Sequence, residues 1–246
     1  MPDVPGVGST HEAGGVADRL ASARRRMERA AERAGRDPAT VRLVAVTKTV
    51  PLERIAEAVA AGVTEIGENR VQEARLKHAS VPPGVHWHLI GHLQSNKASL
   101  AARLFDTIHS LDSERVGAAL AAHRETGRGP IRGLVEVDFT GIAARTGVSP
   151  DGVEELLEAL SGLPALEVVG LMTVAPAGDP EAARDCFRRL RELRDRARER
   201  LGRDLPDLSM GMSDDFEPAI EEGATIVRLG RVIFGPRTPV EVRPPG

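Results

Sequence analysis

The sequence predicts a single α/β domain in which eight parallel β-strands close into a barrel surrounded by helices. The chain has 246 residues, a length typical of one such barrel. Eight short apolar or β-branched runs alternate with segments of helical pattern, as in a parallel sheet covered by helices. Eight is also the number of strands that closes this barrel. We therefore expect a single (β/α)8 TIM barrel with one extra helix before its first strand.

The predicted elements follow in chain order. An amphipathic helix over 16–35 comes first. Strands are expected at 42–47, 63–66, 85–90, 105–109, 131–137, 166–172, 207–210 and 225–229. Helices are expected after the first seven strands, at 52–60, 69–78, 95–103, 112–125, 151–160, 180–201 and 215–222. Residues 1–15 and 238–246 are rich in glycine or proline and lack periodicity, so we predict two tails around a domain at 16–237.

Composition argues against several classes of function. The formal net charge is −3, and the arginines of 16–35 and 184–203 alternate with acids, which predicts solvated faces rather than nucleic-acid patches. Five Phe, one Trp and no Tyr leave little material for stacking on bases. Cys186, the single cysteine, can form neither an intramolecular disulfide nor a cysteine zinc site. No apolar run could span a membrane and no secretory signal pattern is present, so we expect a cytoplasmic protein.

Lysine is scarce in this chain. Of the 33 basic residues only Lys48, Lys77 and Lys97 are lysines. Lysine can lose its proton and attack a carbonyl, whereas the guanidinium of arginine stays protonated. Lys48 follows an apolar strand, where partial burial near Arg228 would lower its pKa and allow it to form a Schiff base. An ordinary surface lysine in a strand-to-helix turn is the alternative interpretation.

Two glycine-containing turns resemble a phosphate-binding site. In a (β/α)8 barrel the functional site lies at the carboxyl ends of the strands, with phosphate often bound after strands seven and eight. Ser213 follows the seventh predicted strand in MGMS, and Arg228, Gly230 and Arg231 end or follow the eighth in RLGR. Small residues allow backbone N–H groups to approach the oxygens of an anion. Two ordinary turns would have the same composition, so both interpretations stay open.

Three histidines, His86, His88 and His92, raise the question of a metal site. His86 and His88 would share one face of a strand. Zinc would need a third ligand, and the histidines that bind zinc usually donate a hydrogen bond to an acidic group. We therefore interpret these residues as packed, hydrogen-bonded histidines and predict no metal.

Five motifs occur in a fixed order along the chain. They are VAVTKTVP, EIGENRVQE, HWHLIGHLQSNK, GLMTVAP and LSMGMSDDFEPAIEEGATIVRLGRVIFGPR. In this order and spacing they resemble the motifs of the pyridoxal phosphate homeostasis proteins, single-domain relatives of the alanine racemase N-terminal barrel. The resemblance covers about residues 16–237. It implies a barrel that binds pyridoxal 5′-phosphate (PLP).

The resemblance also implies roles for individual residues. Lys48 would hold PLP as a Schiff base, and Ser213 would bind the phosphate with the backbone around Gly230 and Arg231. Arg228 would lie beside the cofactor, on the ring-nitrogen or the phosphate side, and Asn69 would lie near the ring. Met210 and Met212 would pack about the phosphate loop. His88 and Asn96 match motif positions to which no role can be given.

Three activities could use a reactive lysine in this barrel. Racemisation needs an acid–base group on each face of a planar carbanion, and the racemases that the barrel resembles use a lysine and a tyrosine from a second domain. This chain has no tyrosine. A class I aldolase would use a carboxylate such as Glu68 and is not excluded. We expect a monomeric PLP-binding homeostasis protein without robust catalysis and with apo-enzymes as transient partners. A weak racemase is the alternative. Relatives often carry a lysine at the position of Arg145, so secondary binding or transfer of the cofactor by a lysine of this loop is in doubt.

Overall fold

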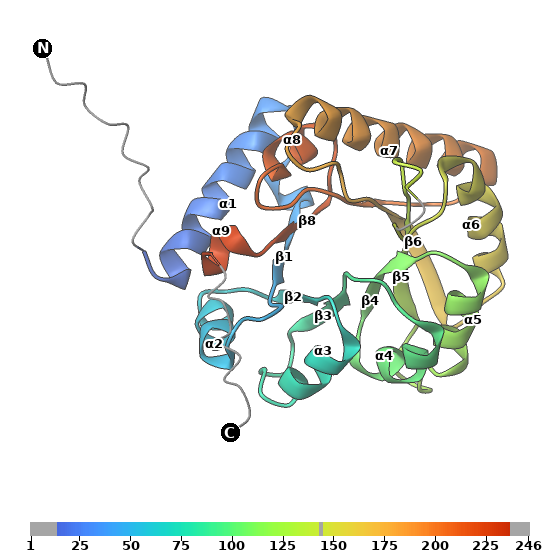
Figure 1. Cartoon of the computed structure of the whole chain (residues 1–246), viewed down its shortest axis with the longest axis horizontal. Coiled ribbons are helices and arrows are strands. Elements are labelled where there is room, and N and C mark those ends of the chain that lie inside the picture. The colour runs from blue at the N-terminus through green and yellow to red at the C-terminus, as the bar shows by residue number, and fades with distance from the viewer. Residues whose placement is uncertain (1–13, 143–144, 237–246) are drawn as a thin grey trace, which may run out of the picture.

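A closed barrel of eight parallel strands forms the centre of the computed structural model, which describes residues 14–142 and 145–236 (Figure 1). Each strand pairs with the next, and β8 pairs with β1 to close the barrel. The strands are β1 (Arg42–Val46), β2 (Glu65–Glu68), β3 (His86–Leu89), β4 (Thr107–Leu111), β5 (Ile131–Glu136), β6 (Leu166–Met172), β7 (Asp207–Ser209) and β8 (Ile226–Leu229). The predicted fold class is confirmed.

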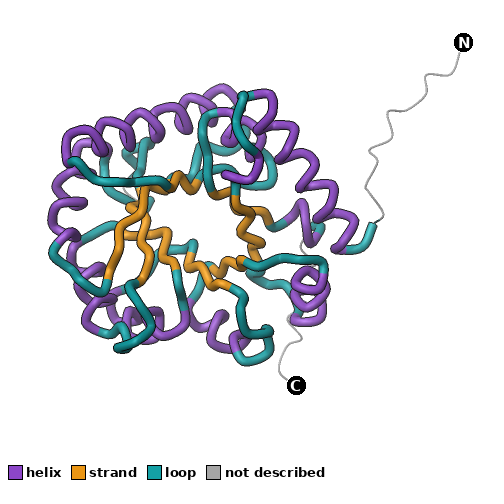
Figure 2. Tube along the Cα trace, turned by 180° about the vertical axis from the view of Figure 1, so that it is seen from behind, coloured by secondary structure: helices purple, strands orange, loops and turns teal. Residues whose placement is uncertain are grey.

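Helices form an outer ring around the strands (Figure 2). They are α1 (Val16–Arg33), α2 (Leu52–Ala60), α3 (Val71–His78), α4 (Ala98–Leu104), α5 (Glu114–Ala122), α6 (Val153–Ser161), α7 (Pro180–Leu201), α8 (Phe216–Glu221) and α9 (Arg231–Phe234). Short 3-10 turns lie at Pro38–Thr40, Ser95–Lys97 and Pro150–Gly152. The extra helix α1 packs against α2, α8 and α9, where the barrel closes between β8 and β1. None of the helices in the described ranges is long and apolar enough to cross a membrane.

Local sequence signals explain where the long helix α7 begins and ends. The carboxylate of Asp179 accepts hydrogen bonds from the N–H groups of Glu181 and Ala182, and Pro180 occupies the first turn, where no donor is needed. Gly202 ends the helix in the left-handed conformation at φ 60°.

Two apolar layers fill the protein. The larger layer lies between strands and helices, and the smaller one lies inside the barrel and contains Val44, Leu134, Val169, Met172 and Ile226. Side chains alternate between the two faces of a strand, so Arg228, two residues after Ile226, also points inward. It donates a hydrogen bond to Ser209, so polar side chains lie inside the barrel together with this apolar layer.

Two strands lie two residues later than the sequence predicts. The apolar run at 63–66 indicated a strand that ends before Glu68, but β2 continues through Glu68, which is buried and paired with Lys77. The fourth strand was expected at 105–109, but Phe105 packs in the outer core and β4 begins at Thr107. An apolar pattern cannot show that a charged residue is buried with a partner. Of the predicted tails at 1–15 and 238–246, residues 1–13 and 238–246 lie outside the described residues.

Candidate functional site

The predicted site residues gather on one side of the barrel rim. Lys48 follows β1, Asn69 follows β2, Ser213 follows β7 and Arg231 follows β8. The strand order in the closed barrel makes β7, β8, β1 and β2 consecutive neighbours. Because the strands are parallel, their carboxyl ends lie at the same rim. The four turns are therefore neighbours along that rim.

The turn that carries Lys48 is constrained on both sides of this residue. Thr47 is fully buried, and its N–H donates to the Gly67 carbonyl of the neighbouring strand at 2.9 Å. Lys48 itself is half-buried. Thr49 has φ 61°, the left-handed region that a β-branched residue rarely adopts, and no other non-glycine residue in the described ranges has a positive φ. Its N–H donates to Glu73 Oε1 at 2.6 Å.

Arg228 places a buried cation just below the rim. Its side chain points into the barrel, where Nη1 donates to Ser209 Oγ at 2.7 Å and Nη2 donates to the Thr173 carbonyl at 2.9 Å. Burial lowers the pKa of Arg228 to about 10, against the opposing charges of Asp215 and Glu136. The guanidinium therefore stays protonated near neutral pH and acts as a donor at a fixed position.

A chain of buried polar groups continues from Arg228 through the barrel interior. Ser209 Oγ lies 2.8 Å from His109 Nδ1, His109 Nε2 lies 2.9 Å from His88 Nδ1, and His88 Nε2 lies 3.2 Å from Glu65 Oε2. Burial holds the pKa of His109 well below its ordinary value, so this ring is neutral. Burial opposes the ionisation of Glu65, but the interactions with His88, Arg42 and His86 together outweigh it and lower the pKa of Glu65.

One direction of donation satisfies the hydrogen bonds from Arg228 to His88. Arg228 can only donate, so Ser209 accepts from it and gives its own proton to His109 Nδ1. His109 then donates from Nε2 to His88 Nδ1, and the Nε2–H of His88 faces the Glu65 carboxylate. A cation at one end and an anion at the other thus fix the tautomers of both histidines.

The loop after β7 turns tightly and contacts the segment that follows β8. Gly211 has φ 91°, and a Cβ added there would lie 2.6 Å from the Ala219 Cβ, so only glycine fits. Asp215 Oδ1 accepts from the Met212 N–H at 2.6 Å, and Ser213 Oγ lies 3.4 Å from the Val232 N–H of the turn after β8. The two glycine-containing turns therefore meet at Ser213, whose hydroxyl can still donate to a ligand.

The remaining residues of this loop take different positions. Arg231 forms an ion pair with Asp214 on the surface. Met210 is fully buried in the outer core, whereas Met212 is 37% exposed at the rim. The backbone of Asn69 packs closely against Gly91. A Cβ added at Gly91 would lie 2.4 Å from the Asn69 carbonyl oxygen.

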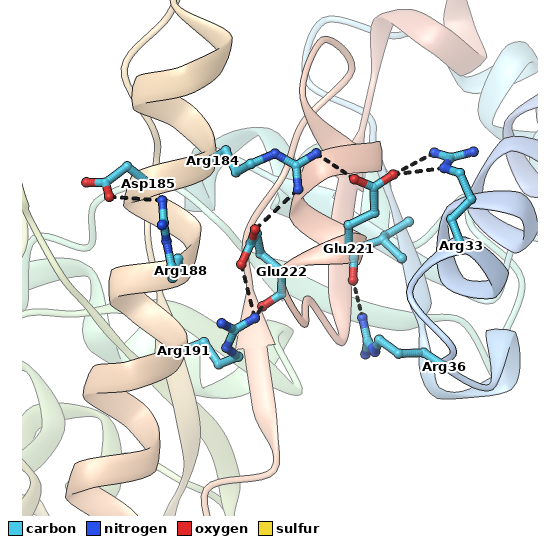
Figure 3. Close-up of polar contacts among 9 residues, drawn as sticks. Arg33, Arg36, Arg184, Asp185, Arg188, Arg191, Glu221 and Glu222 are labelled. Atoms are coloured by element: carbon cyan, nitrogen blue, oxygen red, sulfur yellow. Dashed lines mark hydrogen bonds and ion pairs between the residues drawn. The ribbon is translucent and has the colours of Figure 1, made fainter.

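Ion pairs fasten the helix that follows this loop. Figure 3 shows Glu221 and Glu222, at the end of α8, between arginines of α1 and α7. Glu221 pairs with Arg33 at 2.8 Å and with Arg184 at 2.5 Å, and Glu222 pairs with Arg191 at 3.0 Å. These arginines remain a third to a half exposed to solvent, and helix packing also brings them to the carboxylates of α8.

The three histidines considered for a metal do not converge. His86 is exposed and lies 3.9 Å from Asp106, His88 is buried against His109, and His92 lies 3.2 Å from Asp112. No group of metal-ligating side chains occurs in residues 14–142 and 145–236.

Sequence reasoning missed four residues around the site: Lys77, Glu136, His109 and Ser209. Lys77 is buried beside the Lys48 turn, and the scarcity of lysine was a signal that pointed to it. Glu136, at the end of β5, is also buried, and burial raises its pKa. Its Oε1 accepts from Thr146 at 2.9 Å. His109 and Ser209 lie in short strands where nothing in the local pattern marks them.

Comparison with known proteins gives one consistent result. The alanine racemase N-terminal domain family matches residues 19–238. A pyridoxal phosphate homeostasis protein of Pseudomonas aeruginosa is 42% identical over 90% of this chain and 96% of its own. One of Aquifex aeolicus is 42% identical over 89% of this chain and 97% of its own. PipY of Synechococcus elongatus, solved with PLP bound, is 35% identical with a TM-score of 0.78 over 89% of this chain and all of its own.

These matches cover nearly the whole of the relatives. The chain belongs to the family of pyridoxal phosphate homeostasis proteins, within the alanine racemase N-terminal domain fold.

Proposed function

We propose that this chain binds PLP at the rim formed by β7, β8, β1 and β2 and takes part in PLP homeostasis. The observation that carries the proposal is the convergence of three features at that rim. A lysine stands in a constrained turn, a buried arginine lies below it, and Ser213 joins two glycine-containing turns. Relatives named as PLP homeostasis proteins, and PipY with PLP bound, support the same ligand.

The donor set fits the chemistry of this cofactor. PLP supplies an aldehyde that an amine can attack and a phosphate that hydroxyl and backbone donors can hold. In this proposal Lys48 is the amine, and Ser213 with the backbone of Gly230 and Arg231 holds the phosphate. Asn69 lies near the ring. Met210, which is buried, and Met212, which lies at the rim, pack against the phosphate loop. Arg228 donates a hydrogen bond to the cofactor and, at a pKa of about 10, keeps its own proton.

These residues suit the binding of the cofactor better than the catalytic turnover of a substrate. The groups that could exchange protons with a substrate are mostly occupied elsewhere. His88 and His109 bond to each other inside the barrel, and Glu68 is fully buried with Lys77. The whole chain contains no tyrosine. We therefore propose a carrier that acts in the cytoplasm as a monomer and passes PLP to apo-enzymes in transient contacts.

One residue favours weak racemase-like chemistry as the second candidate. Glu136 is a buried carboxyl whose pKa is raised by burial, and the charge of Arg228 acts on it, so it lies near the proposed site. A buried carboxyl of raised pKa holds a proton more readily than an ordinary one and is a candidate general acid or base. The aldolase alternative is less favoured, because both Lys77 and Thr47 bond to Glu68 Oε1.

The absorption spectrum of the purified protein tests the proposal. We expect a yellow protein whose near-visible band disappears on borohydride reduction, with the cofactor then fixed to Lys48. Lys48→Arg should keep the fold and lose the band, because arginine cannot act as the attacking amine. Peptide mapping that finds the cofactor on Lys77 or Lys97 alone would contradict the assignment.

A further inference from the structure

The ammonium group of Lys77 has three close acceptors around it. Nζ lies 2.7 Å from the Thr47 carbonyl oxygen, 2.8 Å from Glu68 Oε1 and 2.6 Å from Glu73 Oε1. An ammonium has three donors, so each of them is used. The side chain is only 10% exposed. A buried lysine with all donors satisfied holds its partners at fixed positions.

These partners lie on both sides of Lys48. Thr47, directly before it, is held at its carbonyl by Lys77 and at its hydroxyl by Glu68 Oε1, at 2.7 Å. Thr49, directly after it, donates its N–H to the same Glu73 oxygen that Lys77 binds. The two backbone neighbours of Lys48 are therefore tied to one cluster, with Lys77 at its centre.

The turn needs such support. Thr49 has φ 61°, which is unfavourable for a β-branched residue and persists only where surrounding contacts hold it. The supporting groups come from separate elements: Glu68 ends β2, and Glu73 and Lys77 stand one turn apart on α3. The position of Lys48 thus depends on how β2 and α3 pack against the end of β1.

The chemistry of this cluster explains why position 77 is a lysine. Arginine provides almost all of the positive charge in this chain. A planar guanidinium cannot direct three donors from a single atom toward three converging acceptors, whereas an ammonium does. Lys77 is also the less exposed partner of its ion pair with Glu73, whose side chain is 25% exposed.

We infer that Lys77 is a positioning residue that fastens the turn carrying Lys48 and so presets the amine for its ligand. The inference rests on the proposed function only in taking Lys48 as the amine that captures PLP. An ion pair that merely stabilises the barrel would make a different prediction, since its loss would lower the stability and leave the capture of PLP by the folded protein unchanged.

Lys77→Met and Glu73→Ala test the inference. Methionine keeps the length and volume of lysine without its donors, and Glu73→Ala removes the link to Thr49 while Lys77 stays. Arg75→Met is the matched control, since it removes one positive charge from an exposed position of the same helix. Hydrogen–deuterium exchange of the apo-protein over residues 47–50 and the stopped-flow rate of PLP capture are measured for all three.

We expect faster exchange at 47–50 and at least about tenfold slower capture in Lys77→Met, since hydrogen bonds to a charged group are lost. Glu73→Ala should change both quantities in the same direction, and Arg75→Met should change neither. Unchanged exchange and capture in the folded variants would overturn the inference, whatever happens to the melting temperature. If Lys77→Met does not fold, Glu73→Ala decides. If the wild type binds no PLP, the proposed function fails. The hydrogen–deuterium exchange rates at 47–50 then still test whether Lys77 keeps the turn in place.

Discussion

Arg228 Nη1 donates a hydrogen bond of 2.7 Å to Ser209 Oγ inside the barrel, and both side chains are almost completely buried. The same hydroxyl lies within hydrogen-bond distance of His109 Nδ1. The guanidinium is therefore linked to Glu65 through the side chains of Ser209, His109 and His88. The cation near the rim is therefore positioned by side chains from four other strands of the barrel.

Ser209→Ala should destabilise the protein by about 1–3 kcal/mol, because it leaves donors of Arg228 and an acceptor of His109 buried without a partner. Chemical denaturation of the apo-protein measures this difference. Ser161→Ala is the control, since Ser161 is exposed and bonds only to the carbonyl of Glu158 in its own helix. We expect the control to stay within about 0.5 kcal/mol of the wild type. Equal effects of the two substitutions would contradict the role of the buried chain.

His109 should make the stability of the protein depend on pH. Its pKa is lowered in the folded state, so below about pH 6.5 the unfolded chain binds a proton that the folded protein does not. The free energy of unfolding should then fall as pH decreases, by up to about 1.4 kcal/mol per pH unit from this residue. Urea titrations at pH 7.5, 6.5 and 5.5 compare the wild type with His109→Gln. Identical slopes in the two proteins would show that folding does not lower the pKa of His109.

Ser213→Ala and Arg228→Gln should weaken PLP binding by about tenfold or more each, since each removes a donor that we propose for the cofactor. Spectroscopic titration of the apo-protein measures the affinity. Arg228→Gln should also lower the stability, because the Thr173 carbonyl and Ser209 lose their donor, whereas Ser213→Ala should leave the stability unchanged. Unaltered affinity in both variants would exclude this phosphate and ring site.

The carboxylates at the end of α8 should contribute a salt-sensitive share of stability. The double variant Glu221→Gln, Glu222→Gln loses ion pairs with arginines of α1 and α7 (Figure 3). These arginines are roughly a third to a half exposed, so each pair should contribute at most about 1 kcal/mol. Melting temperatures in low and high salt check this, and the gap between variant and wild type should narrow as salt screens the pairs. A gap that does not respond to salt would point to packing instead of charge.

Amino-acid turnover should be absent or slow. We expect L-alanine to show slow exchange of its α-proton with deuterated solvent and little conversion to D-alanine, because an efficient positioned second base typically contributes about 10²–10⁴-fold. Glu136→Gln should remove any conversion that remains, and Lys48→Ala should remove the exchange itself. Turnover of about 1 s⁻¹ or faster that depends on Lys48 would make the protein an enzyme and overturn the carrier proposal.

Much of the fold could be predicted from the sequence because the necessary signals are local. Alternation of apolar strands with amphipathic helices fixes the parallel barrel, and the capping residues Asp179 and Gly202 mark the ends of α7. Parallel strands bring all carboxyl ends to one rim, so turns as distant in sequence as those of Lys48 and Ser213 could be assigned to a shared site without knowledge of any contact.

Only the tertiary structure decided which polar groups are buried and what they bind. Thr47 and Lys77 are 30 residues apart, and His109 and Ser209 are 100 apart, yet each pair is in contact. Sequence patterns assign charged residues to the surface, because burying an unpaired charge is costly. That cost is reduced when packing brings hydrogen-bond acceptors or an opposite charge close, as it does for Lys77, Glu68 and Arg228. The support beneath the predicted site could therefore be found only in three dimensions, since it depends on distances between side chains from different strands and helices.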